Sequence, residues 1–162
     1  MTTSNTNTTT TTTELNPVTA SENLPGFFTL KNGQKVVQTS GHPCAFNDGT
    51  IFRPDEVEEK AIKAYFSFLT VERTFQEVPS PFPGIRYTHS SQRLSEATVN
   101  RLHELVKANP DTMFLVPFMV ESALWEMGIR DKFPTLAGGN ATPETSRETP
   151  DKKIWNLQNM AY

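Results

Sequence analysis

The two ends of this 162-residue chain restrict the part of it that can build a core. Residues 1–13 read MTTSNTNTTTTTT, with nine threonines and no apolar residue after Met1. Ordering a backbone costs about 1–2 kcal/mol per residue, and such a segment has no apolar surface whose burial would offset that cost. The following ten residues are also poor in apolar side chains. We therefore expect an extended or disordered arm over residues 1–23.

The C-terminal end divides into a polar segment and an apolar one. Residues 138–153, GGNATPETSRETPDKK, combine glycine and proline with small or charged side chains, which is the composition of a linker. The last nine residues, IWNLQNMAY, are apolar and aromatic again. The sequence thus predicts one globular domain over residues 24–137, a linker over 138–153 and a docking peptide over 154–162.

The first half of this domain has the pattern of β-hairpins. Asn32-Gly33 separates two segments with apolar residues, 27–30 and 35–39. This dipeptide favours the positive φ angles of a tight hairpin turn. A second, shorter hairpin is expected around Gly49. Together the two hairpins predict an antiparallel meander of three or four strands.

Three helices are expected after the hairpins. The first begins at Pro54, because proline and acidic side chains are both favoured in a first turn. The second has Ser95 as its N-cap and ends before Pro110, and the third runs from Pro117 to Gly128. The predicted fold class is therefore α+β, with a small antiparallel sheet packed against about three helices.

Helical periodicity also assigns buried faces. The first helix has an apolar stripe formed by Val57, Ala61, Ala64, Tyr65 and Phe68, which Ile62, Phe66 and Leu69 broaden. In the third helix, Phe118, Leu124 and Trp125 share the expected apolar face. Glu121 and Glu126 lie on different faces of that helix, which predicts that both are exposed to solvent.

Residues 71–90 are compatible with two structures. The alternation from Val71 to Val78 fits a strand, and the same residues also fit the end of the preceding helix. The proline-rich residues 79–84 exclude a helix interior and favour an extended loop. Residues 85–88 are expected to form a short final strand.

Charge and hydropathy exclude several classes of protein. The net charge of −3 at pH 7 and the pI near 5.6 differ from the strongly basic balance of a nucleic-acid-binding protein, so nucleic acid is an unlikely partner. No apolar run approaches the roughly 18–20 residues that span a bilayer. The N-terminal residues lack the basic and apolar regions of a secretory signal. We expect a soluble protein located in the cytoplasm or within a virus-like particle.

His42 and Cys44 are the one place where a base and a nucleophile lie close in sequence. A reactive cysteine requires a thiolate that a neighbouring base stabilises, but Pro43 holds the chain extended and directs the two side chains apart. The histidines at 42, 89 and 103 have no metal-ligand spacing. No catalytic residue, metal or other cofactor is therefore expected. A small enzyme or ligand-binding site near His42 and Cys44 is the alternative.

The C-terminal peptide is the strongest candidate for a binding site. Trp and Tyr are enriched at binding hot spots, and a tethered peptide can reach a groove on a neighbouring protein. The predicted partner-binding residues are Ile154, Trp155, Leu157, Met160 and Tyr162, together with Phe82 in the proline-rich loop. The alternative is that the peptide folds back onto its own domain.

These observations predict a non-catalytic structural or interaction protein. It would be a small subunit of a larger assembly, for example an accessory or decorating component of a viral particle. Its expected partner is a protein or a multisubunit assembly, which it contacts through its two tails.

Overall fold

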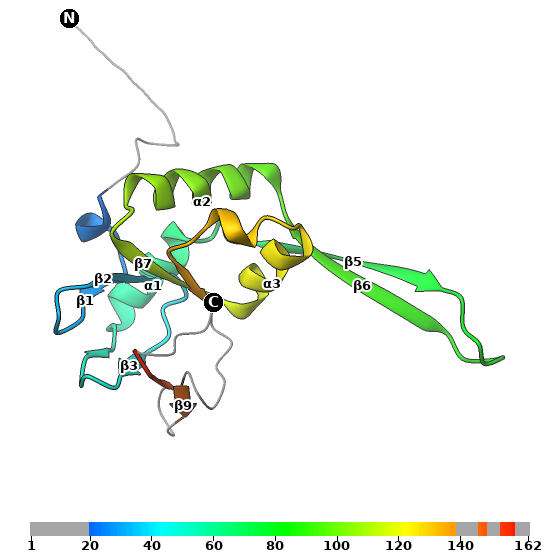
Figure 1. Ribbon diagram of the computed structural model, residues 1–162, viewed down its shortest axis with the longest axis horizontal. Coiled ribbons are helices and arrows are strands. Elements are labelled where there is room, and N and C mark those ends of the chain that lie inside the picture. The colour runs from blue at the N-terminus through cyan, green and yellow to red at the C-terminus, as the bar shows by residue number, and fades with distance from the viewer. Residues whose placement is uncertain (1–19, 139–145, 149–152, 158–162) are drawn as a thin grey trace, which may run out of the picture.

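The computed structural model describes residues 20–138, 146–148 and 153–157 (Figure 1). Its helices are α1 (Glu56–Tyr65), α2 (Glu96–Ala108) and α3 (Phe118–Glu126), and its 3-10 turns are η1 (Ser21–Asn23) and η2 (Arg130–Lys132). Its strands are β1 (Phe27–Thr29), β2 (Lys35–Gln38), β3 (Cys44–Phe46), β4 (Ile51–Phe52), β5 (Val71–Val78), β6 (Tyr87–Leu94), β7 (Thr112–Val116), β8 (Leu136–Gly138), β9 (Ser146–Glu148) and β10 (Lys153–Trp155). The mixed content confirms the predicted α+β class.

The central sheet has the strand order β1-β2-β7-β8 and mixes two directions. β1 and β2 form the antiparallel hairpin predicted at Asn32-Gly33, where Gly33 has a φ of +92°. β2 pairs with β7 in parallel, as β7 does with β8. The predicted antiparallel meander is therefore wrong. Parallel neighbours need a crossover connection, and α3 lies in the one between β7 and β8.

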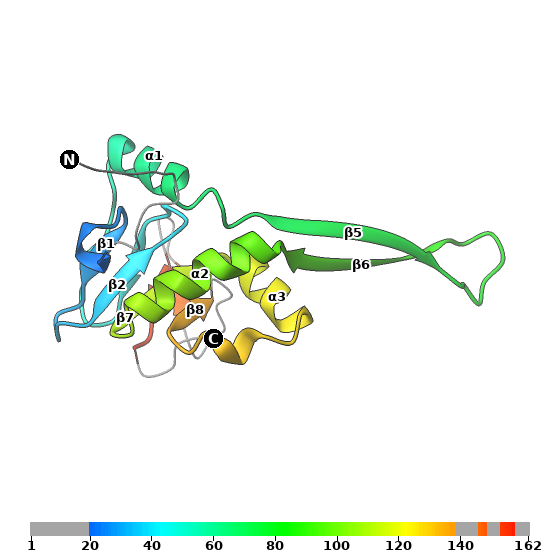
Figure 2. The ribbon, with the colours of Figure 1, turned by 90° about the horizontal axis from the view of Figure 1, so that it is seen from above.

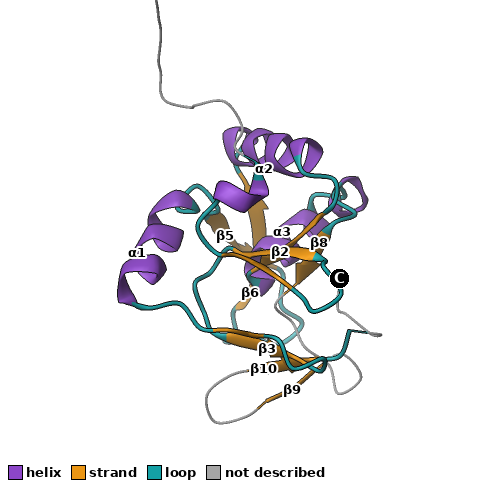
Figure 3. Cartoon of the chain, turned by 90° about the vertical axis from the view of Figure 1, so that its left-hand side faces the viewer, coloured by secondary structure: helices purple, strands orange, loops and turns teal. Residues whose placement is uncertain are grey.

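The second sheet, with the order β4-β3-β10-β9, joins parts of the chain that are far apart in sequence. β3 and β4 form the short antiparallel hairpin expected around Gly49. β10 pairs in parallel with β3 and antiparallel with β9. Figure 3 shows this sheet on one side of the central sheet and α2 on the other. β9 thus lies within the segment for which the sequence predicts a linker, and β10 begins at its last residue.

The N-terminal boundary of the folded part also differs from the sequence prediction. Ser21 falls within the predicted arm, yet it is buried. Its backbone N–H donates to Asn109 Oδ1 at 2.8 Å, and its hydroxyl accepts from Thr112 Oγ1 at 2.8 Å. These contacts tie η1 to the end of α2 and to β7. Residues 1–19 of the predicted arm lie outside the described residues.

Side chains cap the N-termini of α1 and α2. Asp55, directly after Pro54, accepts a hydrogen bond from the N–H of Glu58 at 2.7 Å and thereby caps α1. Ser95 caps α2 as predicted, because its Oγ accepts from the N–H of Thr98 at 3.2 Å. Leu102, Leu105 and Val106 of this helix are buried.

The predicted faces of α1 and α3 are wrong in part. In α1, Val57, Ala61 and Ala64 of the predicted stripe are exposed, whereas Ile62, which was expected to broaden the stripe, is buried. In α3, Leu124 is buried as predicted, whereas Phe118 and Trp125 are exposed. α3 is apolar around most of its circumference, so periodicity alone does not select the face that packs.

Glu121, which the sequence places in solvent, is buried in an ion pair with Arg130. The Arg130 Nε–H donates to Glu121 Oε2 at 3.2 Å, and the two side chains are 1% and 6% exposed, respectively. The same guanidinium donates to the carbonyl oxygens of Phe133 at 2.8 Å and Leu136 at 2.9 Å. The pair therefore ties α3 to η2 and β8.

β5 and β6 form a third, two-stranded sheet that projects from the body of the molecule (Figures 1 and 2). The strand alternative for residues 71–78 is therefore correct, and the helical alternative is wrong. β6 extends six residues beyond the expected short strand at 85–88. Within the described part of the chain, no helix has the length and hydrophobicity needed to cross a bilayer.

Candidate protein-interaction surface

The projecting hairpin is long, and its strands pair without interruption. All eight residues of β5 lie opposite residues of β6, from Val71 opposite Leu94 to Val78 opposite Tyr87. At about 3.4 Å per residue, the paired strands extend over roughly 27 Å. Figure 2 shows that only their base approaches the rest of the molecule.

α3 holds the base of the hairpin in place. The N–H of Gln92 donates to Glu126 Oε1 at 3.0 Å, and the N–H of Leu94 donates to Met127 Sδ at 3.3 Å. Leu94 is fully buried in the core. Because these contacts anchor β6 near its end, the hairpin leaves the body in a defined direction.

Hydrogen bonds at the far end close the loop between the two strands. Arg86 donates two hydrogen bonds to the carboxylate of Glu77, at 3.0 and 3.2 Å. Ser80 Oγ accepts from the N–H of Phe82 at 3.1 Å. Gly84 has a φ of +81°, a conformation that glycine adopts readily.

Large apolar side chains are exposed along the hairpin and at its tip. They are Phe75 (66% exposed), Phe82 (54%), Ile85 (53%) and Tyr87 (39%). The rings of Phe82 and Tyr87 lie 6.5 Å apart, so the tip carries a small aromatic cluster. An isolated two-stranded hairpin is only marginally stable in water. Exposed apolar residues on such an element are typical of a surface that a partner covers.

A second apolar surface lies on α3, which packs against the base of β6. Phe118, Met119 and Trp125 are exposed there, and we call these three residues the α3 face. Phe118 and Trp125 are seven residues apart and therefore lie on one side of the helix, and Met119 lies next to Phe118, about 100° around the helix axis. The hairpin and the α3 face together form the candidate interaction surface.

The structure places the described part of the predicted docking peptide against its own domain. Ile154 lies opposite Ala45 in the parallel pair of β10 with β3. Trp155 is 4% exposed and belongs to the core. The N–H of Leu157 donates to Asn47 Oδ1 at 3.1 Å. The alternative in which the peptide folds back therefore describes residues 153–157, and the Trp155 side chain is not accessible to a partner in this arrangement.

The other residues predicted to contact a partner are Met160, Tyr162 and Phe82. Met160 and Tyr162 lie outside the described residues. Phe82 is exposed at the tip of the hairpin, where a partner can reach it. Sequence analysis missed Phe75 and Tyr87. The sequence did contain a signal for them. Polar residues occupy both faces of the strand at 71–78, which indicates that neither face is buried.

The environment of Cys44 does not favour a reactive thiolate. The side chain is buried, and burial raises the pKa of its thiol from 9.0 to about 11. His42 is exposed. Among the described residues, no three His, Cys, Asp or Glu side chains are grouped so that they could hold a metal ion.

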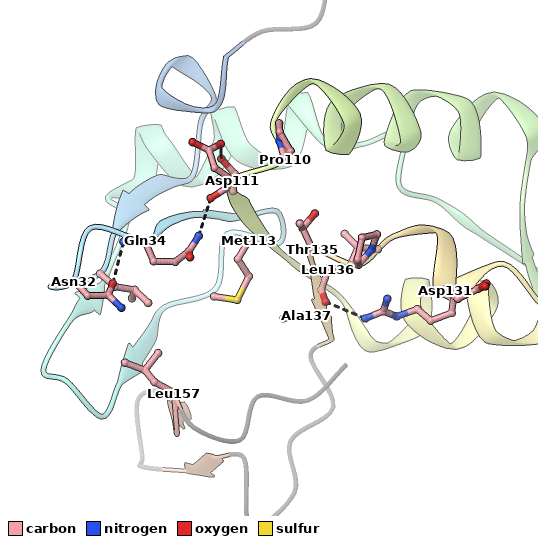
Figure 4. Close-up of a pocket in the computed structure, with 14 residues that line it drawn as sticks. Asn32, Gln34, Pro110, Asp111, Met113, Asp131, Thr135, Leu136, Ala137 and Leu157 are labelled. Carbon is pink, nitrogen blue, oxygen red and sulfur yellow. Dashed lines mark hydrogen bonds between the residues drawn. The ribbon is translucent and has the colours of Figure 1, made fainter.

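A cavity of about 610 Å³ opens beside the β1–β2 turn and the first residues of β7 and β8 (Figure 4). Gln34 Nε2 spans part of it by donating to the carbonyl oxygen of Asp111 at 2.8 Å. Met113, Leu136 and Leu157 supply much of its apolar lining. Neither residue of the His42–Cys44 alternative lines the cavity.

Comparison of the chain with protein-family models, with curated proteins and with solved structures finds no match.

Proposed function

We propose that this chain is a non-catalytic interaction protein that joins a larger assembly through its β5–β6 hairpin. The observation that carries the proposal is the exposure of Phe75, Phe82, Ile85 and Tyr87 on an element that projects from the body and has no core of its own. Association with a partner would bury this apolar surface and stabilise the hairpin. The α3 face at the base of the hairpin extends the proposed contact.

The charge of the hairpin favours a protein partner over a nucleic acid. Residues 71–94 contain three arginines and two glutamates, which leaves a net charge near +1. Arg86 is already paired with Glu77. A hairpin that follows a phosphate backbone needs several unpaired cations, because phosphate contacts supply most of the affinity. Aromatic residues with few net charges are typical of protein interfaces.

The proposal retains two further elements of the sequence prediction. Met160 and Tyr162 remain proposed partner contacts together with Phe82. The single cysteine and the threonine-rich N-terminal residues support a setting in the cytoplasm or within a virus-like particle.

The proposal is tested by affinity purification of the tagged full-length chain from its native source after chemical cross-linking. One variant replaces residues 75–90 by Asn-Gly, so that the pairs from Val71–Leu94 to Thr74–Ser91 remain. A second carries Phe75→Ser, Phe82→Ser and Tyr87→Ser. The matched control carries three polar substitutions on the same hairpin, Thr74→Ser, Gln76→Ser and Thr88→Ser.

We expect the full-length chain and the control to retain a stoichiometric protein partner, and both hairpin variants to lose it. Circular dichroism checks that all four proteins are folded. Retention of the partner by the shortened variant would refute the proposal. A further variant that ends at Leu157 separates any contribution of residues 158–162 while it leaves Trp155 in the core.

The cavity favours a second candidate function, the binding of a small molecule. Its volume lies within the range of about 300–1,000 Å³ typical of ligand sites, and its lining combines apolar side chains with a few polar groups. The test is native mass spectrometry of the protein isolated from its source. A bound compound should be displaced by Met113→Trp, which fills the cavity, and retained by Met119→Trp on the exposed α3 face. The absence of any bound compound would contradict this function.

A further inference from the structure

Among the residues that the structure describes, no strand pairs with the outer edge of β5. In an antiparallel pair, the N–H and C=O of a residue point together towards the partner strand or together away from it, and the direction alternates along the strand. The N–H groups of Gln92 and Leu94 donate to side chains at the end of α3, so they point away from β5. The residues opposite them, Arg73 and Val71, therefore point away from β6. Alternation extends this direction to the other odd-numbered residues of β5.

The outer edge of β6 is less available than that of β5. Its N–H groups near the base are already bonded to α3. An open edge of eight residues is a template for a further strand, and natural proteins usually block or cover such an edge. The outer edge of β5 is therefore expected to pair with a further strand.

The order of the side chains along β5 is complementary to the same order in a second β5 strand that runs antiparallel to it. Arg73, Phe75 and Glu77 lie on one face of the strand, with opposite charges on the two sides of the aromatic ring. We infer that β5 pairs antiparallel with β5 of a second copy of this chain, with Phe75 opposite the partner's Phe75. This inference rests on the proposed function of the hairpin and identifies one of its partners.

In this register each Arg73 lies opposite the partner's Glu77, so that two ion pairs flank the aromatic pair. Arg73 forms no ion pair with any described residue of its own chain. Glu77 is held by Arg86, and a carboxylate has further acceptor sites for a second arginine. Glu77 can therefore keep its contact with Arg86 in the dimer.

Other registers lose these pairs. A shift by one residue places outward-pointing backbone groups opposite inward-pointing ones and breaks the hydrogen-bond ladder. A shift by two residues keeps the ladder, but it places Arg73 opposite the partner's Phe75 and Glu77 opposite the partner's Val71. Both ion pairs are then lost. Charge complementarity thus specifies the register with Phe75 at the two-fold axis.

The pairing forms a continuous four-stranded sheet from the two hairpins. Continuation of the register places the proline-rich loop at 79–84 of each copy beside residues 66–70 of the other, where Phe68 and Leu69 are half-buried. The α3 face lies on the β6 side of the hairpin, so the dimer leaves it open for other proteins of the assembly.

Charge reversal tests the register in solution with the full-length chain. In Arg73→Glu, two glutamates oppose each other twice across the dimer, and in Glu77→Arg two arginines do so. Sedimentation velocity over a concentration series should show the dissociation constant of the dimer rising roughly tenfold or more in each variant. An equimolar mixture of the two variants restores both ion pairs, because every glutamate then faces an arginine. The mixture should therefore dimerise as tightly as the original chain.

Arg93→Glu is the matched control, since it makes the same charge change on β6 away from the β5 edge and should leave the dimer intact. The inference is overturned if the original chain stays monomeric throughout the series, if both single variants dimerise unchanged, or if the mixture stays monomeric. A monomeric chain that still loses its native partner when the hairpin is shortened would leave the proposed function standing while this inference fails.

Discussion

At the scale of single residues, both members of the buried ion pair between Glu121 and Arg130 are expected to contribute strongly to the stability of the fold. Arg130 satisfies the carboxylate of Glu121 and two backbone carbonyl oxygens, all of them buried. Gly138 is required beside this pair, because a methyl group at its α-carbon would overlap the Glu121 carboxylate. Burying both charges is costly, but removing only one of them costs more.

Arg130→Met should therefore lower the free energy of unfolding by about 3–5 kcal/mol, since it leaves a buried carboxylate without its partner. Urea denaturation measures this loss. Arg86→Met is the matched control, because it breaks an arginine–glutamate ion pair that is exposed, and exposed pairs contribute little. Equal effects of the two substitutions would contradict the structural role of Arg130.

Cys44 makes stability depend on pH in the alkaline range. The folded state raises the pKa of the thiol from 9.0 to about 11, so it binds the proton more tightly than the unfolded state does. The resulting stabilisation is present in full below pH 9 and is lost as the pH rises towards 11. A shift of this size corresponds to about 2–3 kcal/mol.

The free energy of unfolding should consequently fall more between about pH 8 and about pH 11 in the original chain than in Cys44→Ala. The difference between the two proteins isolates Cys44 from the lysines and tyrosines that titrate in the same range. Identical pH profiles would show that the thiol is not desolvated in the folded protein.

At the level of elements, the pairing of β10 with β3 holds the described part of the C-terminal region against its own domain. Trp155 fills part of the core, and the N–H of Asn47 donates to its carbonyl oxygen at 2.9 Å. A C-terminal peptide that made no contact with its own domain would not contribute to the free energy of unfolding of that domain.

Trp155→Ala should lower the free energy of unfolding by about 3–5 kcal/mol, as is usual when a buried aromatic residue is truncated. The other tryptophan provides the control. Trp125 is 59% exposed on the α3 face, so Trp125→Ala should change stability much less. Chemical denaturation of both variants gives the comparison. A loss at Trp155 no larger than that at Trp125 would mean that β10 is not part of the core.

Sequence patterns predicted the elements that short-range signals define. Asn32-Gly33 specifies its hairpin because Gly33 supplies the positive φ angle of the turn, and Ser95 specifies the start of α2 because it caps that helix. The parallel pair of β2 and β7 has no such signal. It joins Lys35 to Thr112, and the choice of neighbour depends on packing of the whole sheet.

The candidate site was predictable in one part only. Phe82 was proposed as a contact from its place in the proline-rich loop, and the structure exposes it. β6 was missed beyond Thr88, since the sequence HSSQRL has no apolar alternation that marks a half-buried strand. A strand that is exposed on both faces lacks the hydrophobic pattern by which strands are normally detected.

At the level of the whole molecule, the body and the hairpin differ in how far their side chains are buried. The body contains the buried residues, and the hairpin beyond its base is mostly exposed. Replacing residues 75–90 by Asn-Gly should therefore change the free energy of unfolding of the body only slightly. Thermal and urea unfolding of the shortened chain test this expectation. A large loss of stability would show that the hairpin supports the fold instead of serving as an interaction element.

Hydrogen exchange over residues 71–94 tests the central claim most directly. Amide exchange is measured by mass spectrometry for the dilute free chain and for the chain in its native complex. The account predicts that amides of β5, notably those of Arg73, Phe75 and Glu77, exchange rapidly in the free chain and are protected in the complex. The buried strand β7 should be protected equally in both states. Equal exchange of the hairpin in the free and assembled chain would contradict the claim that the hairpin is the element through which this protein binds its partner.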